Sequence, residues 1–360
     1  MLYKYIIFTT VKQHNMIKVG YNNSQKHTGF VSHCEKPERI HFCVEELKKL
    51  HNKELFVINT VSAATSLELL LHTHSNDYIQ SLINFVPPKL YCRACKNVTN
   101  NKKLSFDDFV VCHPKCLNCK ESTTVDNIFC YLDPDTYFTS KTFDIVLEGV
   151  GVLKTLLDNI KMKLCKYGFA LIRPPGHHCS NKGSGFCVVN NVVVASKYAQ
   201  QIGYSKVFIF DIDFHHGDGT ENLIKNMENI SMCSIHGYGE GIYPGTGRAC
   251  SKTNILNIPL KVTRDPTSRQ YITDDYYLNI VESDVVSFIT NINPDIIIIS
   301  CGFDGHCDDP LEGFNLTDNA YVRTVNCLKQ FDTPLLFVTE GGYSVSAISR
   351  TIGKMVGAMI

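Results

Sequence analysis

The stretch Val207-Phe-Ile-Phe-Asp-Ile-Asp-Phe-His-His-Gly-Asp-Gly219 changes from apolar residues to acidic and imidazole side chains within a few positions. Its apolar start has no polar face, which is typical of a central strand in a parallel sheet covered by helices. Because alternate side chains of an extended segment point the same way, Asp211, Asp213 and His215 are expected to converge. Carboxylate and imidazole ligands suit a cation such as zinc, so we interpret this strand end as a metal site.

Two other apolar segments end in the same way. Asp295-Ile-Ile-Ile-Ile-Ser300 leads into Asp304, and Pro334-Leu-Leu-Phe-Val-Thr-Glu340 leads into Tyr343. In open α/β sheets, ligands bind beyond the carboxyl ends of the parallel strands. The sequence therefore predicts Asp304 as a third metal ligand and places Tyr343 in the same crevice.

A fourth segment brings two adjacent imidazoles. Gly168-Phe-Ala-Leu-Ile172 precedes Arg173-Pro-Pro-Gly-His-His178, in which a stiff turn presents His177 and His178. Histidine is the usual acid and base near neutral pH, and it needs a hydrogen-bond partner that fixes its tautomer. Asp211 and Asp218 are carboxylates that can serve in this way. Two histidine–aspartate pairs beside one metal indicate a hydrolytic site.

With these residues the chain resembles the zinc-dependent histone deacetylases of the arginase-deacetylase fold, and their class II branch most closely. The matching blocks stand in the family's order: His33-Cys-Glu-Lys-Pro-Glu-Arg-Ile40, His72-Thr-His-Ser-Asn-Asp-Tyr78, Arg173 to His178, Gly185-Phe-Cys187 with Asn190-Asn191, Asp211 to Gly219, Tyr243-Pro-Gly-Thr-Gly247, Gly302-Phe-Asp304 with Asp309-Pro-Leu311, and Gly341-Gly-Tyr343. Eight blocks in register leave little room for chance. The resemblance implies an α/β fold, a parallel sheet with helices on both faces, and one catalytic domain over residues 1–360.

The resemblance also implies roles for individual residues. The implied catalytic set is a zinc ion on Asp213, His215 and Asp304, dyads of His177 and His178 with Asp211 and Asp218, and Tyr343 as electrophilic partner. The further implied sites are a potassium site at Asp211, Asp213, His215 and Ser234, a substrate tunnel lined by Gly185, Phe186, Tyr243 and Leu311, and an internal acetate cavity with Arg39. The implied reaction is hydrolysis of an acetyl amide, in which His178 accepts the water proton, an imidazolium protonates the leaving amine, and Tyr343 stabilises the oxyanion.

Positions near the tunnel bear on the substrate. Tyr243 stands where the family usually has phenylalanine, and its hydroxyl adds a polar group to the rim. Leu311 stands where polyamine-selective relatives have glutamate, so we predict that the substrate is acetyl-lysine in a histone or another protein. Glu312 follows directly and leaves hydrolysis of acetylpolyamines open as an alternative. A non-catalytic scaffold that binds through the cysteine-rich insert is the other alternative. The sequence keeps every residue of the implied dyads and the tyrosine, so it gives no sign that activity has been lost.

Residues 91–130 interrupt the resemblance with a cysteine-rich insert. Cys92-Arg-Ala-Cys95 and Cys116-Leu-Asn-Cys119 have the paired spacing of a structural zinc site, so we predict a small zinc-ribbon-like unit. Cys112, His113 and Cys130 are surplus and leave the ligand set open, and a cysteine-containing surface loop is the simpler interpretation. Between positions 92 and 121 basic residues outnumber acidic ones six to three, an excess suited to a protein or nucleic-acid contact and equally common on a solvated face.

Composition restricts the partners and the compartment. The 360 residues are 44% apolar and carry a formal net charge of zero, which supports a large core and excludes a general attraction to nucleic acid. Sixteen cysteines without a recognisable signal peptide indicate a reducing compartment, so we expect the protein in the nucleus or cytoplasm and not secreted. The apolar opening residues are too few for a membrane span, and no membrane partner is expected.

Helical periodicity separates the predicted strands. Apolar residues recur at helical spacing in residues 39–50, 142–160, 273–292, 317–328 and 345–355. These stripes predict helices that pack on both faces of the sheet.

Overall fold

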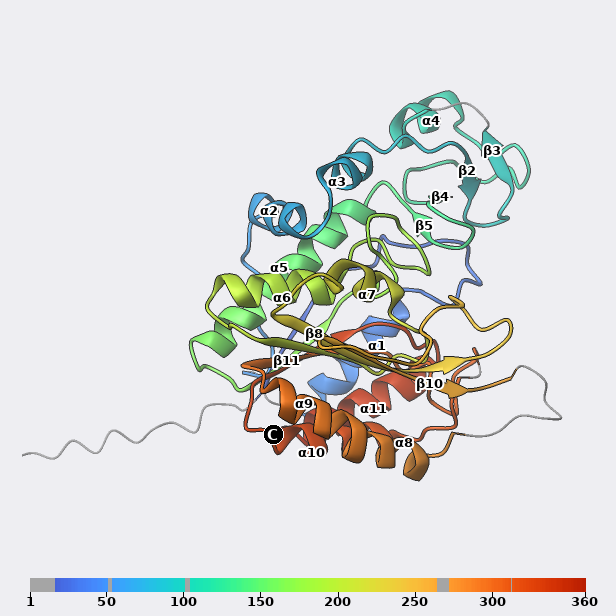
Figure 1. The fold of residues 1–360 in the computed structure, drawn as a ribbon. Coiled ribbons are helices and arrows are strands. Elements are labelled where there is room, and N and C mark those ends of the chain that lie inside the picture. Colours follow the sequence, from blue (N-terminus) through green and yellow to red (C-terminus); the bar gives the residue numbers. More distant parts are fainter. Residues whose placement is uncertain (1–16, 51–53, 101–103, 264–271, 312) are drawn as a thin grey trace, which may run out of the picture.

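The computed structural model describes residues 17–50, 54–100, 104–263, 272–311 and 313–360, and its centre is an eight-stranded sheet (Figure 1). The strands are β1 (Ile17–Tyr21), β6 (Tyr167–Leu171), β7 (Val207–Asp211), β8 (Ile230–Tyr238), β9 (Cys250–Ser251), β10 (Ile255–Lys261), β11 (Ile296–Cys301) and β12 (Leu335–Thr339). Their order is β1-β6-β12-β11-β7-β8-β10-β9, and every neighbouring pair is parallel except the last. The predicted parallel sheet is confirmed, with one short antiparallel strand added at its edge.

Helices cover both faces of this sheet. They are α1 (Glu38–Lys48), α2 (Ala63–Thr73), α3 (Asn76–Ile83), α5 (Thr142–Lys161), α6 (Asn191–Gln201), α7 (Asp218–Ile224), α8 (Asp274–Ile280), the π-helical turn η1 (Val281–Val285), α9 (Val286–Ile292), α10 (Asp318–Lys329) and α11 (Val345–Gly357). Figure 1 shows α2, α5 and α6 above the sheet and α8 to α11 below it. All five predicted helical segments are confirmed, and the one over 273–292 contains the π-helical turn. Within the described part of the chain, no helix combines the length and apolarity that a bilayer crossing needs.

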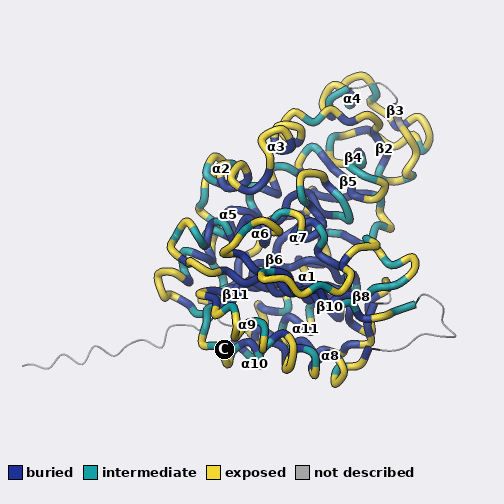
Figure 2. Tube along the Cα trace, viewed as in Figure 1, coloured by how far each residue is buried: buried dark blue, intermediate teal, exposed yellow. Residues whose placement is uncertain are grey.

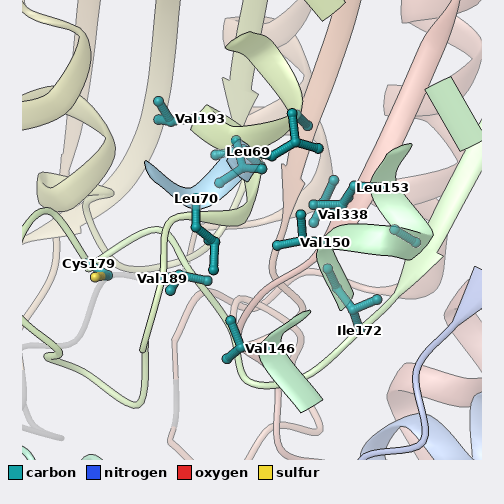
Figure 3. Packing of buried hydrophobic residues seen from close by; sticks show 14 of the residues in the cluster. Leu69, Leu70, Val146, Val150, Leu153, Ile172, Cys179, Val189, Val193 and Val338 are labelled. Carbon is teal, nitrogen blue, oxygen red and sulfur yellow. The ribbon is translucent and has the colours of Figure 1, made fainter. Parts of the chain in front are cut away.

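Alternate residues of each central strand enter two separate apolar clusters, one on each face of the sheet. In β7, Val207 and Ile209 pack with α5 and α6, whereas Phe208 and Phe210 pack with α1 and α11. All four are fully buried, and each buried side chain of this size contributes about 1.5–3 kcal/mol. Figure 2 shows the sheet as the most continuously buried part of the chain, and Figure 3 shows part of the cluster on the α5 side. This double-sided burial holds the strand ends in a fixed register.

The cysteine-rich insert, together with residues 131–138 that follow it, forms a second, antiparallel sheet beside the α2–α5 layer. Its elements are β2 (Leu90–Cys92), β3 (Val98–Asn100), α4 (Phe106–Cys112), β4 (Ile128–Tyr131) and β5 (Tyr137–Phe138), in the sheet order β3-β2-β4-β5. Phe109, Ile128 and Phe138 belong to the same apolar cluster as the core residues of α5 and α6. The insert therefore shares the core of the main domain.

Candidate active site

Three potential metal ligands meet where β7 and β11 end. Asp213, His215 and Asp304 bring one ligand atom each within 4.8 Å of the others. His215 Nδ1 lies 2.7 Å from Asp304 Oδ2 and 3.3 Å from Asp213 Oδ1. Both carboxylates are fully buried, and main-chain N–H groups of Phe214 and Gly341 donate to their other oxygens. The donor set is two carboxylates and an imidazole, which fits a zinc-like cation with room for further ligands.

Glycine allows the chain to pass close to these carboxylates. A Cβ at Gly341 would lie 2.5 Å from Asp213 Oδ2 and 2.7 Å from Asp304 Oδ2. A side chain there would occupy the space between the two ligands. The glycine after β12 is therefore a requirement of the metal site itself.

The electrostatics of this cluster favour a bound cation. Burial raises the pKa of Asp304 to about 7, and the nearby Asp213 carboxylate adds to the rise. Burial alone would lower the pKa of His215, but Asp304 and Asp213 raise it to about 10. The raised pKa of His215 reflects the two carboxylates beside it, whose negative charge a divalent ion would also neutralise.

Two histidine–aspartate pairs lie beside the triad. His177 Nδ1 is 3.1 Å from Asp211 Oδ2, and His178 Nδ1 is 2.7 Å from Asp218 Oδ1. The two imidazole rings lie 4.0 Å apart. Asp211 ends β7 and Asp218 begins α7, so both partners are held by regular structure. Each aspartate fixes the orientation of its imidazole.

The two imidazoles differ in their affinity for a proton. Burial, together with the neighbouring His177, lowers the pKa of His178 to about 4 against the opposing effect of Asp218. Burial would also lower the pKa of His177, but the Asp213 and Asp211 carboxylates raise it well above its ordinary value. At neutral pH this separation leaves the His178 imidazole neutral and the His177 imidazole protonated.

Tyr343 completes the site from the end of β12. Asp309 Oδ2 accepts its main-chain N–H at 2.6 Å, and Phe186 packs edge-on against its ring at 5.7 Å. The Arg39 guanidinium lies 5.0 Å from the ring centre and donates to the main-chain carbonyls of Glu340 and Gly342. Arg39 is thus buried behind the tyrosine and supports the segment that carries it.

A cavity of about 650 Å³ opens onto these groups. Its lining includes three residues of the candidate site, His178, His215 and Tyr343. The other lining residues include Asp135, Gly185, Phe186, Ile242, Tyr243 and Leu311. Tyr243 and Leu311 are 39% and 44% exposed, which places them at the rim. All four predicted tunnel residues therefore line one cavity. Glu312 lies outside the described residues.

The residues of the predicted potassium site also lie together. Ser234 on β8 is paired in register with Asp211 on β7. The Asp211 carboxylate is fully buried and accepts the N–H of Asp213 at 3.1 Å. The Ser234 hydroxyl contacts His236 Nδ1 at 2.9 Å.

Several residues at the site were not predicted from the sequence. Asp135 lies on the turn between β4 and β5 and reaches the cavity only because of how the insert packs. Glu340 accepts the N–H groups of Gly176 and His177 at 2.6 and 3.1 Å. Glu35 is buried between Arg39 and Arg173. The position of Glu340 at the end of an apolar strand was a usable signal for that residue.

In the insert, four cysteines gather and the surplus candidates do not. The sulfur atoms of Cys92, Cys95, Cys116 and Cys119 all lie within 4.8 Å of one another. Cys112 is exposed on α4, the Cys130 thiol donates to the carbonyl of Phe138, and His113 Nδ1 contacts the carbonyl of Phe109. The geometry selects one of the ligand sets that the sequence left open.

This fold and site agree with a known family. The sequence profile of the histone deacetylase domain matches residues 33–359. The chain belongs to the histone deacetylase family. Membership of this family indicates a hydrolase of the deacetylase type, and it agrees with the α/β fold and the clustered polar residues described above.

Individual relatives show how far this similarity extends. Type-2 histone deacetylase 2 of Dictyostelium discoideum is 27% identical over 91% of this chain, which spans 20% of that protein. Histone deacetylase 14, chloroplastic, of Arabidopsis thaliana is 28% identical over 84% of this chain, which spans 76% of that protein. The crystal structure of the HDA15 HD domain superposes with a TM-score of 0.76 at 24% identity, covering 96% of this chain and 89% of that one. This last similarity shows a shared fold.

Proposed function

We propose that this chain is a zinc-dependent deacetylase that hydrolyses the acetyl amide of N6-acetyl-lysine in proteins. The supporting observation is that one cavity is lined by a ligand of the metal triad, by the dyad residue His178 and by Tyr343. Metal-assisted amide hydrolysis can use a metal, a base and an oxyanion donor within reach of the same carbonyl. The family assignment supports the deacetylase reaction, and the substrate and metal are parts of the proposal.

The residues have distinct parts in the reaction. A zinc ion on the triad would polarise the acetyl carbonyl and make a water molecule more acidic. His178 accepts the proton of the attacking water, because its low pKa keeps the imidazole neutral and Asp218 directs Nδ1 away from the substrate. The Tyr343 hydroxyl donates to the carbonyl oxygen as negative charge develops on it. An imidazolium then protonates the lysine amine as it leaves.

The rim of the cavity supports acetyl-lysine as the substrate. Phe186 and Tyr243 provide aromatic surface for a methylene chain, and Leu311 adds an apolar, exposed side chain at the entrance. A polyamine carries a second ammonium group, which an apolar entrance does not attract. The apolar side chain at position 311 therefore supports a protein substrate over a polyamine.

The proposal extends to a potassium ion and to the compartment. Buried Asp211 and its strand neighbour Ser234 support a monovalent cation close to the dyad. All sixteen cysteines are free, which supports an intracellular site of action in the nucleus or cytoplasm.

The test compares two substrates on one purified protein. An acetyl-lysine peptide and acetylspermidine are supplied to the zinc-loaded protein, and released acetate is measured. We expect kcat/KM to be higher for the peptide. Equal or faster turnover of the polyamine would reverse the substrate assignment, and no turnover of either by metal-loaded protein would favour the scaffold alternative.

A further inference from the structure

The four sulfur atoms of the insert have the spacing of a tetrahedral metal site. Cys92 Sγ lies 3.6 Å from Cys119 Sγ, and Cys95 Sγ lies 3.9 Å from Cys116 Sγ. Zinc–sulfur bonds of about 2.3 Å in a tetrahedron require sulfur–sulfur distances of about 3.8 Å. A disulfide would need about 2.05 Å. The sulfurs are therefore placed for a shared ion.

Two turns of the same design carry these sulfurs. In each Cys-x-x-Cys-Lys turn, the lysine N–H donates to the carbonyl of the first cysteine, at 2.8 Å for Lys96 and 3.1 Å for Lys120. Both lysines have positive φ, 55° and 61°, a conformation that costs energy for a residue with a side chain. The same unfavourable conformation at matching places in both turns indicates a common constraint on the sulfurs.

Main-chain donors point at the sulfurs as they do in thiolate sites. The N–H groups of Asn97 and Glu121, each two residues after a second cysteine, donate to Cys95 and Cys119. Cys92 and Cys116 are buried, while Cys95 and Cys119 are partly exposed. The main-chain donors and a bound metal can together stabilise the negative charge of the thiolates, so no charged side chain is required for this.

We propose that Cys92, Cys95, Cys116 and Cys119 bind one zinc ion, and that this ion holds the β4–β5 turn in position against the substrate tunnel. The first half depends only on the sulfur geometry. The second half rests on the proposed deacetylase function and follows from the contacts of the turn.

The connection from the cysteines to the tunnel is short and continuous. Cys92 ends β2 and is paired in register with Ile128 on β4. The turn that follows β4 contains Asp133, whose Oδ2 accepts the N–H of Gly185 at 3.2 Å, and Thr136, whose Oγ1 accepts the N–H of Phe186 at 2.9 Å. Phe186 has a positive φ of 68°, which is unfavourable for a residue with a side chain, so the hydrogen bond to Thr136 helps to hold this part of the tunnel wall. Loss of the ion would release β2 from this arrangement.

The metal is tested without reference to activity. Zinc per chain is measured in the wild type, in Cys95→Ser, and in Cys112→Ser, which changes an exposed cysteine of the same insert outside the cluster. We expect two zinc ions in the wild type and control and one in Cys95→Ser. Cobalt loading adds a second measurement, because thiolate ligands give an intense near-ultraviolet charge-transfer band that oxygen and nitrogen ligands do not. A wild type with one metal and no such band overturns the site, even where Cys95→Ser does not fold.

The coupling to the tunnel is tested in steady-state kinetics with an acetyl-lysine peptide. Thr136→Val removes the acceptor of the Phe186 N–H while the thiolate centre stays intact, and we expect KM to rise about five-fold with a smaller change in kcat. Thr123→Val is the control, because Thr123 Oγ1 is buried without a hydrogen-bond partner among the described residues. Cys95→Ser should raise KM in the same direction. An unchanged KM in folded Cys95→Ser overturns the coupling, whatever Thr136→Val shows, and an inactive wild type that still holds two zinc ions sinks the proposed function alone.

Discussion

The catalytic site and the cysteine cluster of the insert are assembled in opposite ways. His215 and Asp304 are 89 positions apart in the sequence, and they meet because parallel strands end at one edge of the sheet. The cysteine sulfurs in closest contact are 21 and 27 positions apart and belong to two small turns. The geometry of the candidate catalytic site therefore depends on the register of the whole sheet, whereas the cysteine cluster depends on local backbone and, in our proposal, on a shared ion.

The largest effect on activity is expected when one reactive group is removed from the candidate catalytic site and the geometry of the site is kept. In Tyr343→Phe, loss of the hydroxyl removes one donor to the oxyanion and should lower kcat by about 10²- to 10³-fold. The metal content should remain at the wild-type value, because Tyr343 is not in either metal cluster. Tyr276→Phe, at a tyrosine that is 55% exposed, is the control. A kcat within two-fold of the wild type would remove Tyr343 from the mechanism.

A smaller loss is expected when the catalytic metal ligands are displaced and the cysteine cluster is left intact. In Gly341→Ala, the new Cβ would lie 2.5 Å from Asp213 Oδ2 and 2.7 Å from Asp304 Oδ2, so the ligands must separate. We expect metal affinity at this site and kcat/KM to fall by about 10- to 100-fold. The thiolate-to-cobalt band of the insert should not change.

The control for Gly341→Ala is Gly357→Ala, because a Cβ at Gly357 has no neighbouring atom within 4 Å. Thermal unfolding of both variants separates loss of metal from loss of fold. Parallel loss of both metals in a folded Gly341→Ala protein would contradict the independence of the two sites.

The sequence could predict that the proposed catalytic residues lie together because they follow strongly apolar strands. The runs before Asp211, Asp304 and Tyr343 are apolar on both faces, and their parallel pairing brings these positions together. The same logic cannot find Asp135, which reaches the cavity from a turn of the insert. The position of Asp135 depends on how the small antiparallel sheet packs against the rest of the domain, and no periodicity in the sequence encodes this packing.

The insert was predicted less completely for the same reason. The paired cysteine spacing indicated a metal site, but Cys112, His113 and Cys130 could not be excluded as ligands from spacing alone. The shared core, with Phe109 and Phe138 packed among residues of the main domain, depends on contacts between distant segments. Local sequence patterns therefore predict a metal site in the insert more readily than the packing contacts between the insert and the main domain.

A moderate loss of folding stability is expected from a substitution in α10, which covers the face of the sheet far from the insert. Asp318, at the start of α10, accepts hydrogen bonds from Arg350 at 2.7 Å, Lys354 at 2.6 Å and Thr351 at 2.6 Å. Burial would raise the pKa of Asp318, but these donors hold it well below its ordinary value of 3.8. Asp318→Asn should lower the free energy of unfolding by about 1–2 kcal/mol at pH 7, a value that allows for the exposure of both cations.

The pH dependence of this difference has a definite sign. A depressed pKa in the folded state stabilises the protein above the unfolded value, and the contribution falls as the pH drops below about 4. The gap between the wild type and Asp318→Asn, measured by chemical denaturation, should narrow from pH 6 toward pH 3. Asp308→Asn changes a half-exposed partner of the same Arg350 and should show a smaller gap. A gap that widens in acid would contradict this interpretation.

The smallest effect is expected at the rim of the tunnel, where the two regions meet. The Tyr243 hydroxyl lies 2.8 Å from the Ser184 hydroxyl, and the Tyr243 ring stands edge-on to His178 with the ring centres 4.9 Å apart. Because this hydrogen bond is exposed, water replaces it at little cost, and Tyr243→Phe should raise KM for an acetyl-lysine peptide about two-fold. Ser184→Ala removes the same bond from the other side and should give a similar change.

The double variant decides whether the two hydroxyls act as a pair. If the bond between Tyr243 and Ser184 is what holds the rim, Tyr243→Phe combined with Ser184→Ala should be no worse than either single change, because one interaction is lost only once. Additive effects on KM would mean that each hydroxyl contacts the substrate separately. In that case the Tyr243 and Ser184 hydroxyls would be two independent contacts at the tunnel mouth.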